Sequence, residues 1–461
     1  MMPVFDPLRL GTTSLDVLVS ARTTALALAV RQRERLEALL LTARRDSRFY
    51  REHLRAILPG VTPLGLLPPV TRHQLMARFD DWVTDPRLTL AGLQAFTADA
   101  QRVGEPYLGQ YLVWESSGSS HQPGIFVQDA RAMAVYDALE MLRRHSPRPT
   151  QRWLDPMMLT ERIAFVGVTN GHFASFVTMQ RLQRLNPWLP LPVRCFSIMQ
   201  STRALVDGLN AFRPTVIATY PTVAAMLSDE ANHGALQFAP QEVWTGGETL
   251  SATVRRCVTR ALGCTVRNSY GASEFLSIAW ECGHGQLHVN ADWVILESVD
   301  ERGRPVPPGV LSYSTLLTNL ANHVQPLIRY DLGDQITLHR EPCTCGCTLP
   351  VLEVRGRRDD PLRMAGQSGR LVTLLPLALT TVLEEAGVCD FQLRQQDAQT
   401  LLLRLPLQGP EGAAAVKRCR AALKQLATAQ ELQPIKLLAE LGQTMPRGRS
   451  GKAHRIVALA G

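Results

Sequence analysis

Five small residues follow one another in the segment YLVWESSGSSHQPGIFVQD, which covers positions 111–129. They are Ser116, Ser117, Gly118, Ser119 and Ser120. Small side chains let the backbone come close to a ligand, and successive N–H groups in a turn can form a concave site for an anion. The run therefore predicts an anion-binding loop, with an ordinary polar turn between two apolar segments as the alternative.

Cysteine and histidine residues form a second group with the types and spacing of metal ligands. They are Cys282 and His288 in CGHGQLH, and Cys343 and Cys345 in PCTCG. Three thiolates and one imidazole make a tetrahedral zinc set, so we expect a structural zinc site. The uneven spread of the nine cysteines favours a reducing compartment over a disulfide framework. Cys347 and His284 are alternatives for one ligand, and reduced buried thiols without a metal are the alternative for the whole group.

Five further segments combine glycine with charged or hydroxyl residues. They are TGGE (245–248), NSYGASE (268–274), RYDLGD (329–334), GRRDD (356–360) and PRGRSGK (446–452). Each one alone is a weak signal, because such short runs occur by chance in many proteins. Their order and their spread along the chain make chance a poor explanation, so we interpret them as parts of one site.

The composition limits the class of protein. The chain has 461 residues, of which 45% are hydrophobic and 20% charged, as in ordinary globular proteins of about three domain-sized units. We expect no membrane span and no secretory signal, and therefore a cytoplasmic protein. The net charge is +8, but the basic residues are dispersed, so we expect no nucleic-acid partner. A basic surface suits anionic small molecules or an acidic protein.

The periodicity of apolar residues predicts the elements that position these groups. Helical spacing covers residues 22–57 and 131–145. Between about 160 and 270, short apolar runs alternate with helical segments, which predicts α/β layers around a largely parallel sheet. Spacing of two from 286 to 340 predicts a β-rich part. A glycine-rich, charged segment near 356 marks a boundary, so we expect a large domain over 1–355 and a small α+β domain over 356–461.

The ordered motifs resemble those of the adenylate-forming superfamily, and are most similar to the phenylacetate–CoA ligase branch. TNLANHVQPLIRYDLGD (318–334), TGGETLS (245–251) and the cysteine groups carry the likeness to that branch, where similar zinc sites occur. The resemblance covers roughly residues 25–458. It implies an α/β fold with a large N-terminal domain of layered subdomains, a β-rich subdomain, and a small mobile C-terminal domain.

The resemblance implies a nucleotide site for ATP. The run at 116–120 would hold the β- and γ-phosphates. The family's loop usually continues Thr-Gly-Lys-Pro, whereas this chain has SHQP, so the glycine and the lysine are missing and His121 or an arginine could supply the charge. Further nucleotide contacts would come from Gly246, Gly247 and Glu248 along the adenine slot, Tyr270 on the adenine face, its neighbour Gly271, and Asp334 and Arg357 at the ribose. Core packing of Tyr270 and a strand-end turn at Asp334 are the alternatives.

Catalytic roles follow from the same resemblance. Ser273 would bind phosphate, and Glu274 would bind Mg²⁺, which prefers carboxylate oxygen. Lys452 would bridge the acid's carboxylate and the α-phosphate, with a solvated tail lysine as the alternative. Asp359 would be the hinge that lets the small domain rotate.

The acid pocket has the weakest sequence signal. In the family it lies between the strand near 165 and the strand of Tyr270. The local candidates are His172, Phe173, Tyr220, Pro221 and Ala272. Ordinary core packing of these residues is the alternative.

Taken together, the residues predict a ligase that adenylates a carboxylic acid, with an aromatic acid favoured by the branch, and transfers the acyl group to a thiol. The acceptor would be coenzyme A, with the phosphopantetheine of an acidic carrier protein as the alternative. A non-catalytic nucleotide-binding protein with a degenerate phosphate loop is the alternative of another class. The oligomeric state is open, and a homodimer is one alternative.

Overall fold

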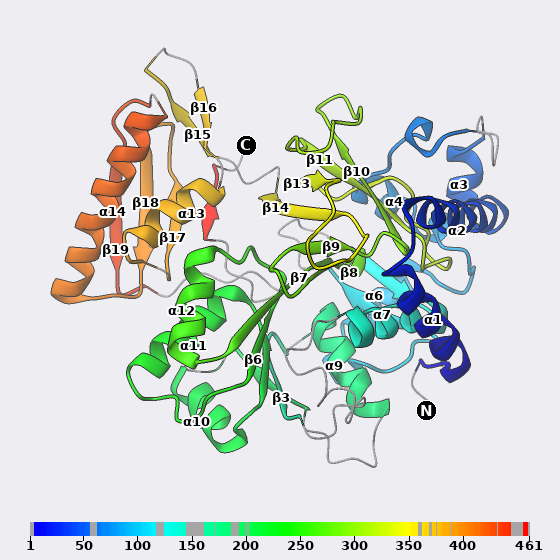
Figure 1. Cartoon of the computed structure of the whole chain (residues 1–461), viewed down its shortest axis with the longest axis horizontal. Helices are drawn as coiled ribbons and strands as arrows, with labels where there is room; N and C mark the ends of the chain where they lie inside the picture. The colour runs from blue at the N-terminus through cyan, green and yellow to red at the C-terminus, as the bar shows by residue number, and fades with distance from the viewer. Residues whose placement is uncertain are drawn as a thin grey trace.

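The computed structural model describes residues 4–55, 62–116, 124–143, 161–169, 171–185, 193–198, 200, 202–357, 362–367, 371–374, 376–388, 390–430, 432–443 and 455–459 (Figure 1). Several predicted site residues lie outside these ranges, namely 117–120, Asp359 and Lys452. The side chain of Arg357 is also outside the description. No helix among the described residues is both long and apolar enough to cross a membrane.

The described residues up to position 102 are mostly helical. The helices are α1 (Pro7–Ser20), α2 (Ala25–Asp46), α3 (Arg48–His53), η1 (Leu64–Leu66), α4 (Arg72–Ala77), α5 (Phe79–Trp82), α6 (Leu90–Thr97) and η2 (Ala100–Arg102). The helical structure expected over residues 22–57 is confirmed, and it consists of two helices, α2 and α3. The break between them falls at Ser47, which is extended and whose hydroxyl accepts a hydrogen bond from the N–H of Tyr50 at 3.2 Å. A serine in this position begins a new helix.

A two-stranded ribbon brackets the serine run. Strands β1 (Leu112–Glu115) and β2 (Ile125–Gln128) are antiparallel, and α7 (Ala130–Arg143) follows. Side-chain amide groups form hydrogen bonds to the backbone along the edge of β2 that faces away from β1. Gln325 accepts from the N–H of Val127 at 2.8 Å and donates to the carbonyl of Ile125 at 2.9 Å, and Asn322 donates to the carbonyl of Val127 at 2.8 Å.

The predicted α/β alternation is confirmed. Strands β3 (Ile163–Gly167), β4 (Val193–Ser197), β5 (Val216–Thr219), β6 (Glu242–Thr245) and β7 (Thr265–Ala272) are parallel, in the order β4-β3-β5-β6-β7. They alternate with α9 (Ala174–Leu185), α10 (Thr202–Phe212), α11 (Pro221–Asn232) and α12 (Ala252–Leu262). Helices α10, α11 and α12 pack on one face of these strands, and α7 and α9 lie on the other (Figure 1).

The predicted β-rich part is confirmed, and it continues the same sheet. Strands β8 (Phe275–Glu281), β9 (Leu287–Val289), β14 (Val351–Arg357) and β13 (Asp334–His339) extend the sheet beyond β7 with antiparallel pairing. Strands β10 (Val294–Val299), β11 (Ser314–Asn319) and β12 (Tyr330–Asp331) form a second sheet of three strands. The hairpin of β7 and β8 therefore joins the two halves, with the NSYGASE motif at its turn.

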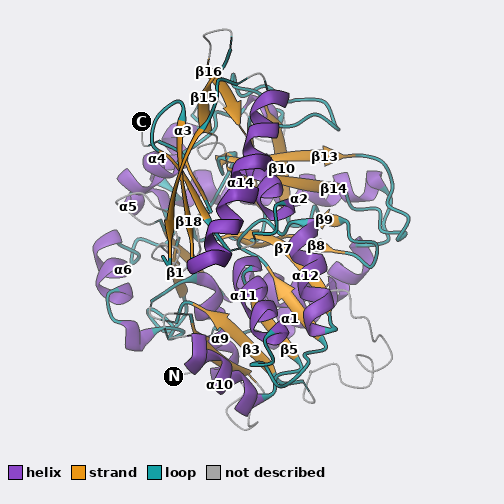
Figure 2. Ribbon diagram, turned by 90° about the vertical axis from the view of Figure 1, so that its left-hand side faces the viewer, coloured by secondary structure: helices purple, strands orange, loops and turns teal. Residues whose placement is uncertain are grey.

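The C-terminal part has a hydrophobic core of its own. It contains β15 (Leu362–Ala365), β16 (Leu371–Leu374), α13 (Pro376–Glu385), β17 (Gln392–Gln395), β18 (Thr400–Leu405), α14 (Gly409–Ala429), β19 (Lys436–Leu441) and β20 (Ile456–Val457). Four strands pair in the order β19-β18-β17-β20, and α14 covers this sheet (Figure 2). Helix α13 contacts α12 across the boundary, where Ser251 donates a hydrogen bond to Glu384.

Candidate functional site

The serine run lies between two paired strand ends. Ser116 is the described member of the run and is almost buried. Its N–H donates to the carbonyl of Gly124 at 2.7 Å, and its hydroxyl accepts from the N–H of Gly124 at 2.8 Å. Positions 117–123, which lie between these two residues, are outside the described residues, so the phosphate role of the run stays a prediction.

Tyr270 and Asp334 are 64 positions apart, and the fold brings them into contact. The phenol of Tyr270, near the end of β7, donates to Oδ2 of Asp334 at 2.5 Å. Asp334 begins β13, and its carbonyl accepts from the hydroxyl of Thr315 at 2.7 Å. Tyr270 and Asp334, which are expected to contact adenine and ribose, are therefore neighbours. The hydrogen bond from the Tyr270 hydroxyl holds the Asp334 carboxylate in place.

The turn between β7 and β8 is held from two sides. Tyr330 donates from its phenol to Oε1 of Glu274 at 2.8 Å, and Asn319 donates to the carbonyl of Glu274 at 3.0 Å. From β1, the indole N–H of Trp114 donates to the carbonyl of Ser273 at 2.8 Å. Sequence analysis did not assign a role to Tyr330, although it lies within the quoted RYDLGD segment. Its hydrogen bond to Glu274 depends on the pairing of β11 with β12, which the sequence does not reveal.

Two glycines of the motifs are required by the backbone. Gly247 has φ of +77°, a conformation that residues with a side chain rarely adopt. A Cβ atom at Gly271 would lie 1.9 Å from the carbonyl oxygen of Leu276, which the hairpin cannot accommodate. Beside the first glycine, Glu248 accepts from the N–H of Thr222 at 3.2 Å. Glycine is therefore needed at both positions, for the turn after β6 and for the close contact between the backbones of β7 and β8.

Three of the acid-pocket candidates have surroundings of different kinds. His172 is buried, and its Nε2 donates to the carbonyl of Asp99 at 3.0 Å while its ring packs against the edge of Phe96. Tyr220 is buried in the core shared by β5 and α11. Phe173 pairs with Glu115 through a single β-bridge. The acid role of these residues stays a prediction.

A small cavity, partly open to solvent, lies between α7 and strands β6, β7 and β8. Residues lining it include Leu139, Trp244, Thr245, Arg267, Ser269 and Trp280. Thr245 directly precedes the glycine pair, and Ser269 directly precedes Tyr270. The cavity therefore begins beside the nucleotide motifs and continues along the strands away from them. Sequence analysis missed it, because a tryptophan in an apolar strand is typical of core packing.

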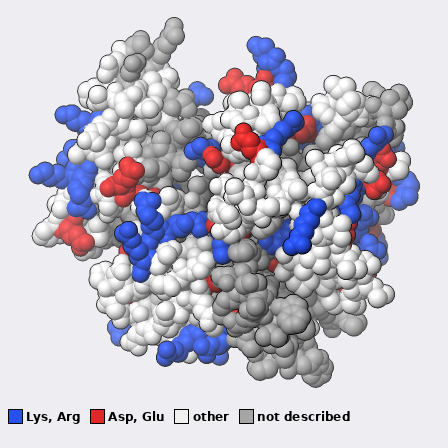
Figure 3. Space-filling view, viewed as in Figure 1, with Lys and Arg blue, Asp and Glu red and all other residues white. Residues whose placement is uncertain are grey.

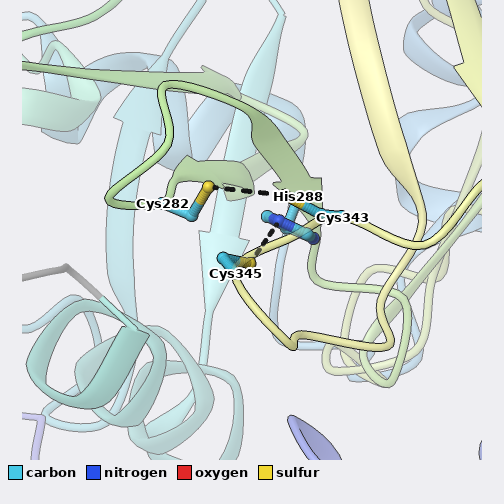
Figure 4. A group of neighbouring side chains, drawn as sticks. All are labelled: Cys282, His288, Cys343 and Cys345. Carbon is cyan, nitrogen blue, oxygen red and sulfur yellow. Dashed lines mark hydrogen bonds between the residues drawn. The ribbon is translucent and has the colours of Figure 1, made fainter.

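The four predicted metal ligands come together. The ligand atoms of Cys282, His288, Cys343 and Cys345 all lie within 4.8 Å of one another, and Figure 4 shows the side chains pointing toward a common centre. Nε2 of His288 is 3.3 Å from the Cys345 sulfur, and the sulfurs of Cys282 and Cys343 are 3.9 Å apart. Backbone N–H groups also point at the Cys282 and Cys345 sulfurs, each at 3.4 Å.

The state of His288 suits a metal ligand. Its Nδ1 lies 2.9 Å from the carbonyl of Leu349, which can only accept, so Nδ1 carries the proton and Nε2 presents its lone pair to the sulfurs. Burial lowers the pKa of His288, which keeps the imidazole neutral. The two alternative ligands lie outside this group of four, and His284 instead bonds Thr344 at 2.9 Å. The ring of His288 stacks on Trp280, with the centroids 5.4 Å apart, so the cluster borders the cavity.

Charged side chains are mixed on the surface. On the face that Figure 3 shows, arginine and lysine side chains form several separate groups with acidic side chains between them. This mixture agrees with the dispersed positions of the basic residues in the sequence.

Comparisons with known proteins were made on sequence and on fold. Residues 192–311 match the family of AMP-binding enzymes. Over 176 residues the chain is 32% identical to the phenylacetate-coenzyme A ligase of Thermus thermophilus, covering 36% of this chain and 39% of that protein. It is 25% identical over 210 residues to protein CapK of Staphylococcus aureus, covering 45% of each. The chain thus matches less than half the length of these curated relatives.

Solved structures match over nearly the whole chain. A crystal structure of 2-hydroxyisobutyryl-CoA ligase in the postadenylation state has a TM-score of 0.71 at 18% identity and covers 95% of this chain and 91% of that one. The same ligase in the thioesterification state has a TM-score of 0.58 at 19% identity, with the same coverage. The predicted α/β fold class is confirmed. The arrangement of elements here is nearer to that of the first structure than to that of the second.

Proposed function

We propose that this chain, whose AMP-binding segment and fold are those of the adenylate-forming superfamily, is an AMP-forming ligase that joins a carboxylic acid to a thiol. The match of residues 192–311, which contain TGGE and NSYGASE, to AMP-binding enzymes supports this proposal. One observation carries the proposal most directly. Two phenol–carboxylate bonds, Tyr270 to Asp334 and Tyr330 to Glu274, bring motifs from distant parts of the sequence together near the turn between β7 and β8.

Each of these groups suits one part of ATP. The ring of Tyr270 would lie on the adenine, and Asp334, with Arg357, would accept or donate hydrogen bonds at the ribose. The run at 116–120 and Ser273 would hold phosphates, and Glu274 would bind the Mg²⁺ that accompanies them. The glycines at 246 and 247 would leave room for the base.

The reaction would proceed in two steps. A carboxylate oxygen of the acid attacks the α-phosphorus, the bond to pyrophosphate breaks, and an acyl-adenylate forms. A thiol sulfur then attacks the acyl carbon, and AMP leaves with the bonding electron pair. Lys452 would neutralise the charge that gathers in the first step, so catalysis rests on positioning and charge stabilisation.

The two steps need different surroundings for the adenylate. We propose that the part over 1–355 holds the substrates, and that the part over 356–461 turns about Asp359 between the steps. The hydrogen bond between Ser251 and Glu384 would form in only one of the two orientations of the C-terminal part. The acceptor thiol is coenzyme A in this proposal, with a carrier protein as the alternative, since both are acidic and the chain carries a net charge of +8.

The cavity beside Thr245 and Ser269 would take the tail of the acid. Its two tryptophans offer flat apolar walls beside the nucleotide motifs. The resemblance to the phenylacetate–CoA ligase branch favours an aromatic acid. The carboxylate would then point toward Tyr270 and the nucleotide.

The cluster of three thiols and one imidazole fits a zinc ion of structural type, because four protein ligands complete a tetrahedral set and leave no position for substrate. Zinc would there join the hairpin of β8 and β9 to the segment around Cys343 and Cys345. No step of the reaction uses it.

Acid-dependent release of pyrophosphate from MgATP, over a panel of aromatic and short aliphatic acids, tests the proposal. Lys452→Ala should abolish the release, and the matched control Lys424→Ala, at an exposed position of α14, should retain it. No release with any acid would contradict the ligase. Calorimetric binding of ATP without turnover would then favour a non-catalytic nucleotide-binding protein.

A further inference from the structure

Three described residues other than glycine have a left-handed backbone, and one of them is buried. They are Leu108, Arg213 and Arg329, with φ of +50°, +49° and +52°. Leu108 lies beside Gly109 in the turn before β1, and Arg213 directly follows α10, so both are exposed residues at places where left-handed backbone is common. Arg329 is buried and directly precedes strand β12, so its conformation has another cause.

The contacts of Arg329 hold its backbone in this conformation, which is unfavourable for a residue with a Cβ atom. Its N–H donates to the hydroxyl of Thr318 at 3.0 Å, and its carbonyl accepts from the N–H of Val70 at 3.1 Å. The guanidinium Nε donates to Oε2 of Glu297 at 3.0 Å, and Nη1 donates to the carbonyl of Leu67. Main chain and side chain are thus both fixed, on one side by the three-stranded sheet and on the other by the segment after η1.

Tyr330, the next residue, is held between the same two neighbours. It pairs with β11 on one side. On the other side Val70 bonds the residues before and after it, since the N–H of Asp331 donates to the carbonyl of Val70 at 2.9 Å. The conformation of Arg329 therefore sets the direction in which the chain enters Tyr330, whose phenol donates to Oε1 of Glu274 at 2.8 Å.

The charged groups of this region form two separate sets. Among the described residues, the guanidinium of Arg329 pairs with Glu297, and no hydrogen bond or ion pair joins it to Glu274. The phenol of Tyr330 provides the contact with Glu274 instead. An effect of Arg329 on Glu274 would therefore pass through Tyr330.

We propose that Arg329 is a positioning residue for the metal side of the nucleotide site, an inference that rests on the proposed ligase function. Its guanidinium fixes the backbone before Tyr330, and the phenol then holds Glu274 in the orientation that binds Mg²⁺ together with ATP. Glycine at position 329 would suit the backbone conformation, but it would release the contacts with Glu297 and Leu67. The phenol of Tyr330 would then lose its fixed approach to Glu274.

Calorimetric binding of ATP to the full chain, in Mg²⁺ and in EDTA, tests this role without turnover. Arg329→Gly should raise Kd for MgATP by up to about tenfold, the size of one weakened hydrogen bond to a carboxylate, and should leave Kd for metal-free ATP unchanged. Arg213→Gly is the matched control, because it makes the same substitution at an exposed residue with nearly the same φ. It should change neither Kd.

A double-mutant cycle shows whether the effect passes through Tyr330. Tyr330→Phe should raise Kd for MgATP at least as much as Arg329→Gly, and the double variant should raise it no further than Tyr330→Phe alone. Arg329→Gly also leaves Glu297 without its ion-pair partner, which lowers stability, so Arg329→Lys is measured beside it. Lysine keeps a charge for Glu297 but lacks the planar fork that reaches Leu67 as well, so Tm should stay near that of the wild type while Kd for MgATP still rises.

The outcomes separate this inference from the ligase function. Effects that multiply in the double variant, an unchanged Kd for MgATP in the folded Arg329 variants, or an equal rise for metal-free ATP or for Arg213→Gly would overturn the inference. Each of these results leaves the ligase to its own test by pyrophosphate release. The expected cycle in a protein that releases no pyrophosphate with any acid would sustain the inference and contradict the ligase, whereas no binding of ATP by the wild type would overturn both.

Discussion

Replacing Glu384 by glutamine should separate the two steps of the proposed reaction. The Glu384 side chain, at the end of α13, has no exposed surface. It accepts a hydrogen bond from the hydroxyl of Ser251 and pairs with Arg455 at 2.5 Å. Ser251 in turn caps α12, since its hydroxyl accepts from the N–H of Val254 at 3.1 Å. One carboxylate thus ties the C-terminal part of the chain to the loop that follows the glycine motif.

The size of the effect follows from these contacts. Glutamine keeps the shape and a neutral hydrogen bond to Ser251, but it loses the charge. A hydrogen bond to a charged group contributes about 1.5–3 kcal/mol and a neutral one about 0.5–1.5 kcal/mol, so the contact with α12 weakens by about 1.5 kcal/mol. The pair with Arg455 lies within the C-terminal part, so its loss affects both positions of that part alike. The equilibrium between the two orientations of the C-terminal part should therefore shift by roughly tenfold.

Separate assays of the half-reactions measure this shift. We expect acid-dependent exchange of pyrophosphate into ATP to slow by up to about tenfold, because it uses the arrangement in which the contact exists. Thioester formation from prepared acyl-adenylate should keep its rate. Glu385→Gln, at the exposed neighbouring position, is the matched control and should change neither. An equal slowing of both half-reactions, or no change in either, would refute the reasoning.

Three other substitutions test the site. Tyr270→Phe keeps the ring but frees Asp334, so KM for ATP should rise about tenfold with little change in kcat, while an unchanged KM would mean that the bond does not position the carboxylate. Tyr330→Phe leaves Glu274 without its phenol donor, so the half-maximal Mg²⁺ concentration should rise, and a loss of rate that added Mg²⁺ does not restore would contradict this. Cys345→Ser should lower both the zinc content by elemental analysis and Tm, and wild-type protein without zinc would contradict the metal site.

Cys257→Ser is the control for the last of these. Cys257 is exposed on α12, away from the cluster, and its loss should leave zinc content and Tm unchanged. A fall in Tm for both variants would indicate a general effect of removing thiols.

The sequence predicts the order of elements better than their contacts. The helical structure over 22–57 and the alternation from β3 to β7 follow from local spacing, and the structure has both. Helix α1 was not predicted, because Leu8 and Leu15 are apolar but exposed, so the helix lacks a regular amphipathic pattern. The continuity of the sheet through β7 and β8 could not be predicted, since local spacing says nothing of which strands pair.

The same difference applies to the site. The cysteine group was predicted because ligand type and spacing are local, and the four residues do come together. The role of Tyr330 depends on the pairing of β11 with β12, which no local pattern reveals. His172 was a candidate for the acid pocket, and that role stays a prediction, although one of its ring nitrogens bonds the carbonyl of Asp99.

The amides that bond β2 also affect how molecules of this protein meet. A strand with a free row of N–H and carbonyl groups is a template for a strand from another molecule. Gln325 and Asn322 occupy those groups on Ile125 and Val127 with side chains, which offer no further edge. Because these residues are buried, the edge of β2 is closed inside the molecule and offers no pairing surface to a second one. Leucine at position 325 would have nearly the same size, but it would leave the N–H of Val127 and the carbonyl of Ile125 buried without partners, at a cost of about 1–3 kcal/mol for each group.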